Sequence, residues 1–310
     1  MNVVFMGTPE IAVPTLKALL DNNINVSLVV CQPDKPKGRG KKLAPPPVKE
    51  FALENKLEVY QPEKIKNNPE AYEKIKSYNP DFLVVVAYGK ILPKEILEIP
   101  KKAPINVHFS LLPKYRGAAP VNWAIINGEE ITGVTTMFMD TGLDTGDILL
   151  KEETKIDKKT ALELLNELSV VGANLLIKTI KQFDSITPTK QNDEEATYAP
   201  ILKKEDGLLD FNEDAVIIER KIRGLQPWPT AYTYLNNKML KIFNADVVEN
   251  NSNLEPGTIF DVTKKSFKIK CKNNALLIKE LQFEGKKRME ASAFLAGYKL
   301  ENGIKLTNTH

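Results

Sequence analysis

The most apolar stretches in the first 150 residues are short, continuous runs rich in Val, Ile and Phe. A continuous run is typical of a strand buried on both faces, because a half-buried strand alternates apolar with polar positions. The runs lie at residues 3–6, 26–31, 82–87, 105–108 and 134–139. They predict the strands of one buried sheet.

The segments between these runs carry apolar residues at a helical spacing, at residues 11–20, 48–55, 69–77 and 119–126. Alternating strands and helices predict an α/β domain with a Rossmann-like, mostly parallel sheet covered on both faces. Ligands of such sheets bind at the carboxyl ends of the strands. Gly7, Thr8 and Pro9 follow the first strand, but the pattern G-x-G-x-x-G is absent, which argues against a dinucleotide cofactor.

The pattern of apolar and polar residues changes after a long amphipathic helix predicted at residues 161–181. A polar, Pro-containing segment follows, and beyond it one helix at residues 213–223 precedes short β-rich runs. These runs lie at residues 231–235, 239–247, 257–261, 267–271 and 275–282. Close turn signals between short strands predict a small antiparallel barrel. We therefore predict domains at residues 1–183 and 204–310, joined by a linker at residues 184–203.

Composition narrows the class of protein. The hydrophobic fraction of 42% is that of an ordinary globular chain. The strongest apolar run, at residues 82–87, is far shorter than the ~20 residues that span a bilayer. The first residues lack the basic segment of a secretory signal, and two distant cysteines make no disulfide framework. We expect a soluble, cytoplasmic protein without a membrane partner.

The small net charge of +3 is unevenly distributed. Residues 203–310 hold 18 Lys and Arg against 14 Asp and Glu, and residues 33–49 hold six basic residues against Asp34 alone. Pro and Gly are interleaved with these charges, so an extended loop is expected there. Two readings stay open at this point, a contact with phosphates or an ordinary solubilising surface.

Three polar residues are candidates for chemistry. His108 ends a predicted strand, and alternation places Asn106 on the same face, about 6.5–7 Å away along the backbone. Asp144 lies in a loop dense in Asp and Gly after another strand. A structural His, a capping Asn and ordinary turn chemistry are the alternative readings. A zinc site lacks ligands, since the only other histidine is His310, and no G-x-S-x-G elbow occurs.

Longer motifs around these residues resemble the formyltetrahydrofolate-dependent formyltransferase family. The matching strings are Asn106-Val-His108, Ser110-Leu-Leu-Pro-Lys-Tyr-Arg-Gly-Ala-Ala-Pro120 and Gly142-Leu-Asp144-Thr-Gly-Asp147. Segments 6–9, 32–42 and 227–229 are similar to those of the family members that act on initiator tRNA. The resemblance covers nearly the whole chain. Phe109 departs from it, since the family more often has a small residue there, and its ring is expected to narrow the folate entrance.

The resemblance implies transfer of the formyl group of N10-formyltetrahydrofolate, a co-substrate, to the α-amino group of initiator methionyl-tRNA. Asn106 and protonated His108 would donate hydrogen bonds to the formyl oxygen as negative charge develops on it. Asp144 would orient His108, favour its imidazolium form and help to move a proton from the amine to the leaving N10. No metal is implied.

The resemblance also implies the binding residues and the second domain. Ser110, Leu111, Leu112 and Pro113 would line the folate site, and the backbone around Val86, Tyr88 and Gly89 would hold the pterin. Arg39, Lys41 and Lys42 would contact the tRNA. The second domain would be an OB-like barrel lying along the tRNA, and the protein is expected to be a monomer.

Two other functions are considered. An N-formyltransferase acting on an amino-sugar nucleotide would share Asn106, His108 and Asp144, but would have no use for the basic loop. A non-catalytic RNA-binding protein would have no need of all three residues together. Purine-pathway formyltransferases are disfavoured because they lack a second domain of about 100 residues.

Overall fold

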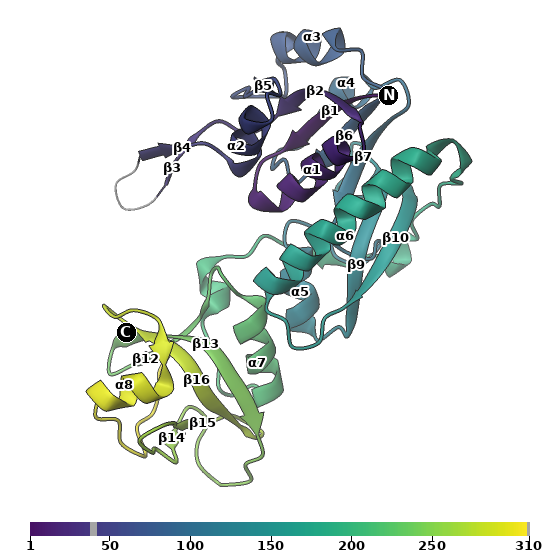
Figure 1. The fold of residues 1–310 in the computed structure, drawn as a ribbon. Coiled ribbons are helices and arrows are strands. Elements are labelled where there is room, and N and C mark those ends of the chain that lie inside the picture. Colours follow the sequence, from purple (N-terminus) through teal and green to yellow (C-terminus); the bar gives the residue numbers. More distant parts are fainter. Residues whose placement is uncertain (38–41, 309–310) are drawn as a thin grey trace. The chain divides into compact units, whose positions relative to one another are not determined.

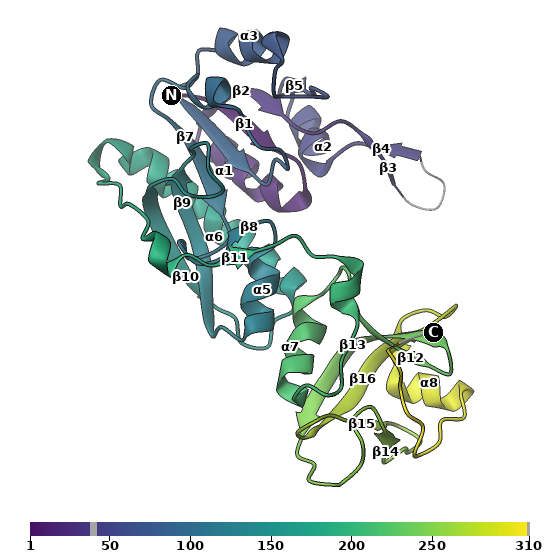
Figure 2. The same cartoon turned by 180° about the vertical axis from the view of Figure 1, so that it is seen from behind.

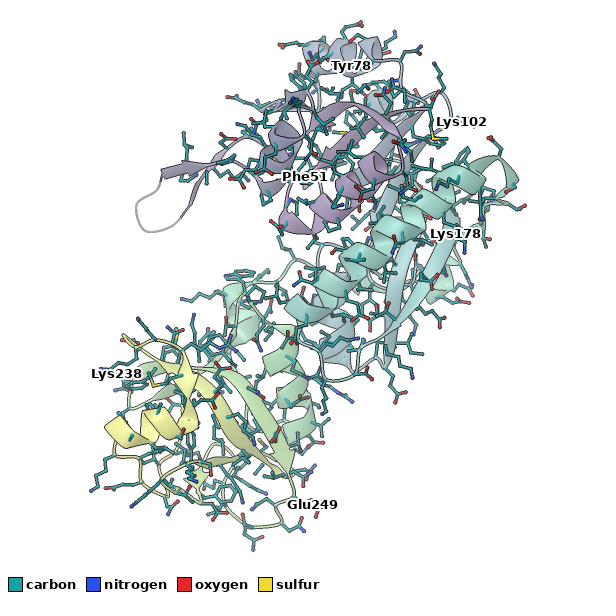
Figure 3. The ribbon with its side chains drawn as sticks, in the orientation of Figure 1. Phe51, Tyr78, Lys102, Lys178, Lys238 and Glu249 are labelled. Atoms are coloured by element: carbon teal, nitrogen blue, oxygen red, sulfur yellow. The ribbon has the colours of Figure 1, made fainter. Side chains whose placement is uncertain are left out.

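A computed structural model describes residues 1–37 and 42–308, with the side chains of Lys37 and Lys42 left undescribed. The chain forms two compact units (Figure 1). Unit 1 consists of Met1–Pro120, Ile131–Lys155 and Leu165–Ala199. Unit 2 consists of Val121–Glu130, Ile156–Leu164 and Pro200–His310. The polar surface of both carries exposed charged side chains such as Lys178, Lys238 and Glu249 (Figure 3).

Unit 1 is built on one seven-stranded sheet in the order β10-β9-β7-β6-β1-β2-β5. The strands are β1 (Asn2–Gly7), β2 (Asn25–Val30), β5 (Val59–Tyr60), β6 (Phe82–Val86), β7 (Ala103–His108), β9 (Ile131–Phe138) and β10 (Ile148–Lys155). The first five are parallel, while β9 is antiparallel to both β7 and β10. The predicted mostly parallel α/β sheet is confirmed.

Helices cover both faces of this sheet (Figures 1 and 2). They are α1 (Val13–Asp21), preceded by a 3-10 turn at Glu10–Ala12, α2 (Pro47–Glu54), α3 (Pro69–Ser77), α4 (Lys94–Leu97) and most of α6 (Ala161–Gln182). Helix α3 begins where Asn68 accepts a hydrogen bond from the amide of Ala71, with Pro69 in the first turn. One face of β1 and β6 packs against α3 and α4 through Val4, Met6 and Leu83.

Helix α6 packs on the opposite side of β7 from Asn106 and His108. Gly172 makes this close approach possible, because a Cβ there would lie 2.9 Å from the Cγ1 of Val107. The ring of Phe109 is buried beside the same glycine. The expectation that this ring narrows the folate entrance is therefore wrong, since strand alternation turns residues 107 and 109 away from the Asn106 face.

The basic segment forms a hairpin at its base. Strands β3 (Lys35–Lys37) and β4 (Lys42–Ala44) pair antiparallel, where the Pro and Gly content predicted an extended loop. Arg39 and Lys41 lie outside the described residues, and Lys42 is described by its backbone alone.

Unit 2 contains an antiparallel sheet in the order β12-β13-β16-β15-β14, with β17 pairing with β16. Its strands are β12 (Ala231–Leu235), β13 (Lys238–Val248), β14 (Ile259–Phe260), β15 (Lys268–Lys270), β16 (Ala275–Phe283) and β17 (Met289–Glu290). Residues 304–307 close the sheet into a barrel, because they bond to residues 257–259 on one side and to Tyr234 on the other. The predicted small barrel is confirmed.

Three helices complete unit 2, α5 (Pro120–Asn127), α7 (Ala215–Gly224) and α8 (Ala291–Gly297). Helices α5 and α7 pack closely, and the Asn122 amide donates a 2.7 Å hydrogen bond to the carbonyl of Gly224. A short pair of strands in unit 1, β8 (Arg116–Gly117) and β11 (Tyr198–Ala199), is parallel. Among the helices of the described chain, none is both long and apolar enough to cross a membrane.

Candidate active site

His108 is the buried centre of the candidate site. It ends β7 and is 6% exposed. Its Nε2 lies 2.9 Å from the carbonyl oxygen of Tyr115. A carbonyl can only accept, so Nε2 carries a proton and donates it to this bond. The other ring nitrogen, Nδ1, is thereby left to face the rest of the site.

Asp144 reaches His108 from the loop between β9 and β10. Its Oδ2 lies 3.6 Å from Nδ1 of His108 and accepts a 2.8 Å hydrogen bond from the amide of Gly117. Strand β9 ends beside Pro104, whose carbonyl accepts from the amide of Met139. Pro104 precedes His108 by four positions on the strand, about 13 Å at the usual rise. The loop after β9 therefore folds back along β7 before Asp144 meets the imidazole.

Asn106 supplies an uncommitted amide on the same face of β7. It precedes His108 by two residues, pairs with Met137 through the backbone and is half-buried. No hydrogen bond of its side chain to another described residue is found. Its NH2 group is therefore free to donate to a ligand.

Two of the residues around the imidazole have left-handed backbone conformations. Tyr115 has a φ of 61° and Asp144 a φ of 55°. Such values are uncommon for residues with a side chain, and they cluster at functional sites because the surrounding structure must hold them. Each of these residues contributes one of the oxygens that face His108, so both left-handed conformations lie within the candidate site.

The segment predicted to line the folate site divides into buried and half-buried positions. Ser110 is fully buried, and its hydroxyl donates to the carbonyl of Lys114. Leu112 packs with Met137 and Ile148. Leu111 and Pro113 are half-buried. Leu111 and Pro113 are therefore the residues of this segment with exposed surface, while Ser110 and Leu112 shape the turn.

In the segment predicted to hold the pterin, the backbone is more accessible than the side chains. Val86 ends β6, and both Val86 and the ring of Tyr88 are buried in the core. The Tyr88 carbonyl already accepts a hydrogen bond from the hydroxyl of Thr8. Gly89 has a φ of 84°, and a Cβ there would meet no atom within 4 Å. The open side of this turn is therefore at Gly89.

An ion pair closes the base of the β3–β4 hairpin. Asp34 precedes β3, and Lys49 lies in α2 after β4. The Nζ of Lys49 is 2.8 Å from both carboxylate oxygens of Asp34. The amide of Gln61 donates to Asp34 and to the carbonyl of Gln32. Hydrogen bonds from Lys49 first, and then from Gln61, hold the pKa of Asp34 below its usual value.

The polar segment before β11 contacts the site, although no feature of its sequence indicates this. The hydroxyl of Thr197 accepts from the amide of Tyr115, and the amide of Gln191 donates to the carbonyl of Asp144. These are side chains in a stretch without apolar periodicity, so no pattern could identify them. The pairing of β11 with β8 and the bridge between Thr189 and Ile148 bring them to the site.

Other chemistries have no support among the described residues. Cys31 and Cys271 are buried, and burial raises the pKa of each thiol to about 12, so neither is a thiolate nucleophile. No group of three or more His, Cys, Asp and Glu side chains in the described chain is placed to hold a metal ion.

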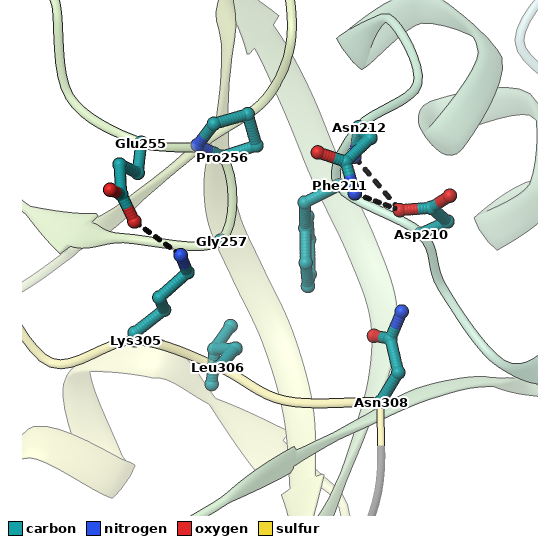
Figure 4. Close-up of a pocket in the computed structure, with 9 residues that line it drawn as sticks. All are labelled: Asp210, Phe211, Asn212, Glu255, Pro256, Gly257, Lys305, Leu306 and Asn308. Carbon is teal, nitrogen blue, oxygen red and sulfur yellow. Dashed lines mark hydrogen bonds and ion pairs between the residues drawn. The ribbon is translucent and has the colours of Figure 1, made fainter.

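A separate pocket of about 380 Å³ lies in unit 2 (Figure 4). Its charged and amide groups are largely engaged with one another. Glu255 pairs with Lys305, and Asn212 donates to Asp210. Among the described groups that line it, the amide of Asn308 has no hydrogen bond, but no histidine lies beside that amide as His108 does beside Asn106.

Known proteins match this chain over most of its length. The sequence profile described as formyl transferase matches residues 1–180, and the profile of the formyl transferase C-terminal domain matches residues 201–299. The methionyl-tRNA formyltransferase of Clostridium novyi is 53% identical over 304 residues, which are 97% of this chain and 98% of that protein.

Solved structures share the fold at lower identity. The methionyl-tRNA formyltransferase of Clostridium thermocellum matches with a TM-score of 0.59 at 22% identity, over 81% of this chain and 95% of that one. The N-formyltransferase of Helicobacter canadensis, in complex with folinic acid and dTDP-3-aminofucose, matches with a TM-score of 0.66 at 21% identity, over 93% and 99%. On the profile matches and the 53% identity over nearly its whole length, this chain belongs to the formyl transferase family.

Proposed function

We propose that this protein transfers the formyl group of N10-formyltetrahydrofolate to the α-amino group of methionyl initiator tRNA. Membership of the formyl transferase family and the 53% identity to a methionyl-tRNA formyltransferase support the reaction. The observation that carries the residue roles is the buried His108, with Nδ1 3.6 Å from the Asp144 carboxylate and the free amide of Asn106 two residues away.

The reaction needs donors for an oxygen that becomes negative. The α-amino group, with a reference pKa near 8, has an appreciable neutral fraction at pH 7 and attacks the formyl carbon. Charge then moves onto the formyl oxygen. Asn106 donates to that oxygen through its NH2 group, which binds no other described side chain. Fixed donors of this kind commonly contribute ~10²–10³ in kcat.

His108 donates through Nδ1. Its Nε2 is committed to the Tyr115 carbonyl, whereas the 3.6 Å from Nδ1 to Asp144 is longer than a good hydrogen bond. An imidazolium satisfies both directions, since each ring nitrogen then carries a proton. The formyl oxygen binds near Nδ1, and the negative charge of Asp144 stabilises the positive charge of the imidazolium.

Asp144 also serves the proton balance. The new bond joins the methionine nitrogen to the formyl carbon, and the bond from that carbon to N10 breaks. The amine loses a proton and N10 gains one, so the products are N-formylmethionyl-tRNA and tetrahydrofolate. A carboxylate beside the reacting atoms, acting directly or through one water, relays this proton.

The folate is proposed to lie between two segments, the turn at Val86–Gly89 and the turn at Ser110–Pro113. Leu111, Pro113 and the backbone at Gly89 are the groups open to it. The tRNA is proposed to contact Arg39, Lys41 and Lys42, which belong to the basic segment of residues 33–49. The net charge of residues 203–310 suits contacts of the barrel with tRNA phosphates.

A monomer is the proposed working form. Tyr115, Gly117 and Asp144, which surround His108, all come from the same chain. The proposed location is the cytoplasm, where the tRNA acceptor is found. Light scattering on the purified protein at the assay concentration tests the monomer.

A product assay tests the reaction. The protein is incubated with N10-formyltetrahydrofolate and initiator tRNA charged with labelled methionine, and the tRNA is then deacylated. We expect labelled formylmethionine to form in step with tetrahydrofolate. Tetrahydrofolate without formylmethionine would mean hydrolysis of the donor and would reject the proposal.

A further inference from the structure

One segment of the chain, residues 189–199, is here called the strap. It bonds to Tyr115, whose carbonyl faces one side of His108, and to Asp144, whose carboxylate faces the other. It begins at Thr189, which exchanges two backbone hydrogen bonds with Ile148 at the start of β10. It ends in β11, which pairs with β8. Between these anchors lies Gln191, whose side chain points to the loop that carries Asp144.

The side chain of Gln191 uses all of its hydrogen-bonding capacity. Its Nε2 donates to the carbonyls of Asp144 and Gly146, at 2.8 Å each. Its Oε1 accepts from Nε and Nη2 of Arg116, at 3.0 and 2.9 Å. A primary amide has two donor hydrogens and one oxygen with two lone pairs, so no other orientation of this side chain satisfies the site.

Arg116 is a buried cation that fixes the orientation of Gln191. Its side chain is 3% exposed, and Nη2 also donates to Asp193 at 2.8 Å. The backbone next to it serves the catalytic carboxylate, since the amide of Gly117 donates to Oδ2 of Asp144. The Asp144 loop is therefore held in two ways at β8. The side chain of Arg116 orients Gln191, and the backbone amide of the next residue, Gly117, binds Asp144 directly.

The same strap also braces the opposite side of the imidazole. The hydroxyl of Thr197 accepts a 2.9 Å hydrogen bond from the amide of Tyr115, whose carbonyl accepts the hydrogen bond from Nε2 of His108. Both oxygens that face His108 thus belong to left-handed residues with a bond to residues 191–197.

We propose that Gln191 is a positioning residue, which, held by Arg116, keeps the Asp144 carboxylate at its distance from His108 during formyl transfer. Asp144 comes from a loop that must fold back along β7, so its position depends on the anchors of that loop. Gln191 binds the loop on either side of Thr145, at the carbonyls of residues 144 and 146. This inference rests on the proposed function of His108 and Asp144.

Two substitutions of Gln191 separate positioning from folding. Gln191→Ala removes every bond. Gln191→Glu keeps an acceptor for Arg116 but has an oxygen in place of the NH2 group, so it loses the bonds to the loop and sets an acceptor against the two loop carbonyls. We expect both variants to lower kcat, on the order of 10²-fold, because small displacements of catalytic groups have effects of that size. The KM values for folate and tRNA should be unchanged.

The matched control is Asn192→Ala. Asn192 is the next residue, and among the described residues its side chain bonds to Glu194 and Glu195 alone, within its own turn. We expect this variant to keep the wild-type kcat. The melting temperature of Gln191→Glu should lie closer to that of the wild type than that of Gln191→Ala does, because the Arg116 pairing remains.

Histidine NMR supplies a readout that does not depend on any acceptor. The chain has two histidines, and His310→Gln leaves only the signals of His108. We expect Gln191→Ala and Gln191→Glu to shift the ring nitrogen resonances of His108, and Asn192→Ala to leave them in place. Unshifted resonances with wild-type kcat in both Gln191 variants would overturn the inference. So would a loss of kcat that follows the melting temperature without a change at His108.

The outcomes also separate this inference from the proposed function. If the wild type transferred no formyl group to tRNA, the proposed function would fail, while the resonances of His108 would still report whether Gln191 sets its surroundings. If the wild type were active and Gln191→Glu were equally active, the positioning role alone would fail.

Discussion

Nδ1 of His108 lies 3.6 Å from Oδ2 of Asp144, although the aspartate belongs to a loop that begins at the other end of β7. The distance is close enough for a charge interaction, yet too long for the carboxylate to take up the ring nitrogen as a hydrogen-bond donor. A ligand oxygen can therefore share that nitrogen. The Tyr115 carbonyl thus fixes the imidazole of His108, while Nδ1 of the ring stays available for a hydrogen bond to a ligand.

Removal of either partner should abolish most of the turnover. We predict that His108→Ala and Asp144→Ala each lower kcat for formyl transfer by ~10²–10³, the usual effect of losing one preorganised group at a developing oxyanion. Binding of tRNA, measured by filter retention, should be nearly unchanged. Asp184→Ala is the control, because that carboxylate pairs with Lys102 at the surface. Wild-type turnover in either variant would remove its residue from the mechanism.

Asn106 should be important for the reaction and unimportant for the fold. Its amide has no bond to another described side chain, so Asn106→Ala should change the free energy of unfolding by less than about 0.5 kcal/mol. We predict that kcat falls by ~10²–10³ in the same variant. Asn106→Asp should be as slow, because a carboxylate offers no donor. Urea titration and single-turnover transfer measure the two effects. Full activity of Asn106→Asp would contradict a donor role.

Arg39 tests the assignment of the basic hairpin to tRNA. We predict that Arg39→Ala raises KM for methionyl-tRNA and leaves folate affinity unchanged. Affinity of the wild type for tRNA should fall steeply with salt, because basic groups release counterions from phosphates, and the slope should be smaller in the variant. Equal losses of folate and tRNA binding would assign this segment to the wrong ligand.

The Asp34–Lys49 pair should make a pH-dependent contribution to stability. The pKa of Asp34 is lowered in the folded state from its ordinary value of 3.8, so the contribution is present above that value. It is lost as the pH falls through the lower, folded pKa. We predict that Asp34→Asn is less stable than the wild type at pH 7 and that the difference shrinks as the pH falls below 3.8.

Urea titrations of both proteins from pH 7 down to pH 3 provide this comparison. Asp184→Asn is a suitable control, since its carboxylate is exposed and also pairs with a lysine, Lys102. A stability difference that persisted unchanged at the lowest pH would mean that the Asp34→Asn substitution disturbs the hairpin by its shape rather than by its charge.

Elements with strong apolar patterns were predictable from the sequence. Strands β1, β2, β6, β7 and β9 and helices α1 to α3 follow the predicted runs closely, since burial on both faces leaves continuous apolar stretches. Strand β10 was missed because it lies at the edge of the sheet. Its second half, Lys151–Lys155, is mostly polar and exposed, so it shows neither a buried run nor a clean alternation.

The site was predictable only in part. Asn106 and His108 lie on one strand, so alternation relates them directly. The meeting of His108 with Asp144 depends on how a loop folds back, and the roles of Gln191 and Thr197 depend on hydrogen bonds between distant residues. Such contacts leave no local pattern in a single sequence. The position of Phe109, in contrast, was predictable. The strand alternation that relates Asn106 to His108 also places Phe109 on the opposite face of the sheet.

The most direct test compares acceptors at one donor concentration. Initiator methionyl-tRNA, elongator methionyl-tRNA and an amino-sugar nucleotide are supplied in separate reactions with N10-formyltetrahydrofolate, and kcat/KM is measured for each. The account predicts efficient transfer to the initiator tRNA and little to the other two. Transfer to the sugar nucleotide alone would keep Asn106, His108 and Asp144 as the site, but would contradict initiator tRNA as the acceptor.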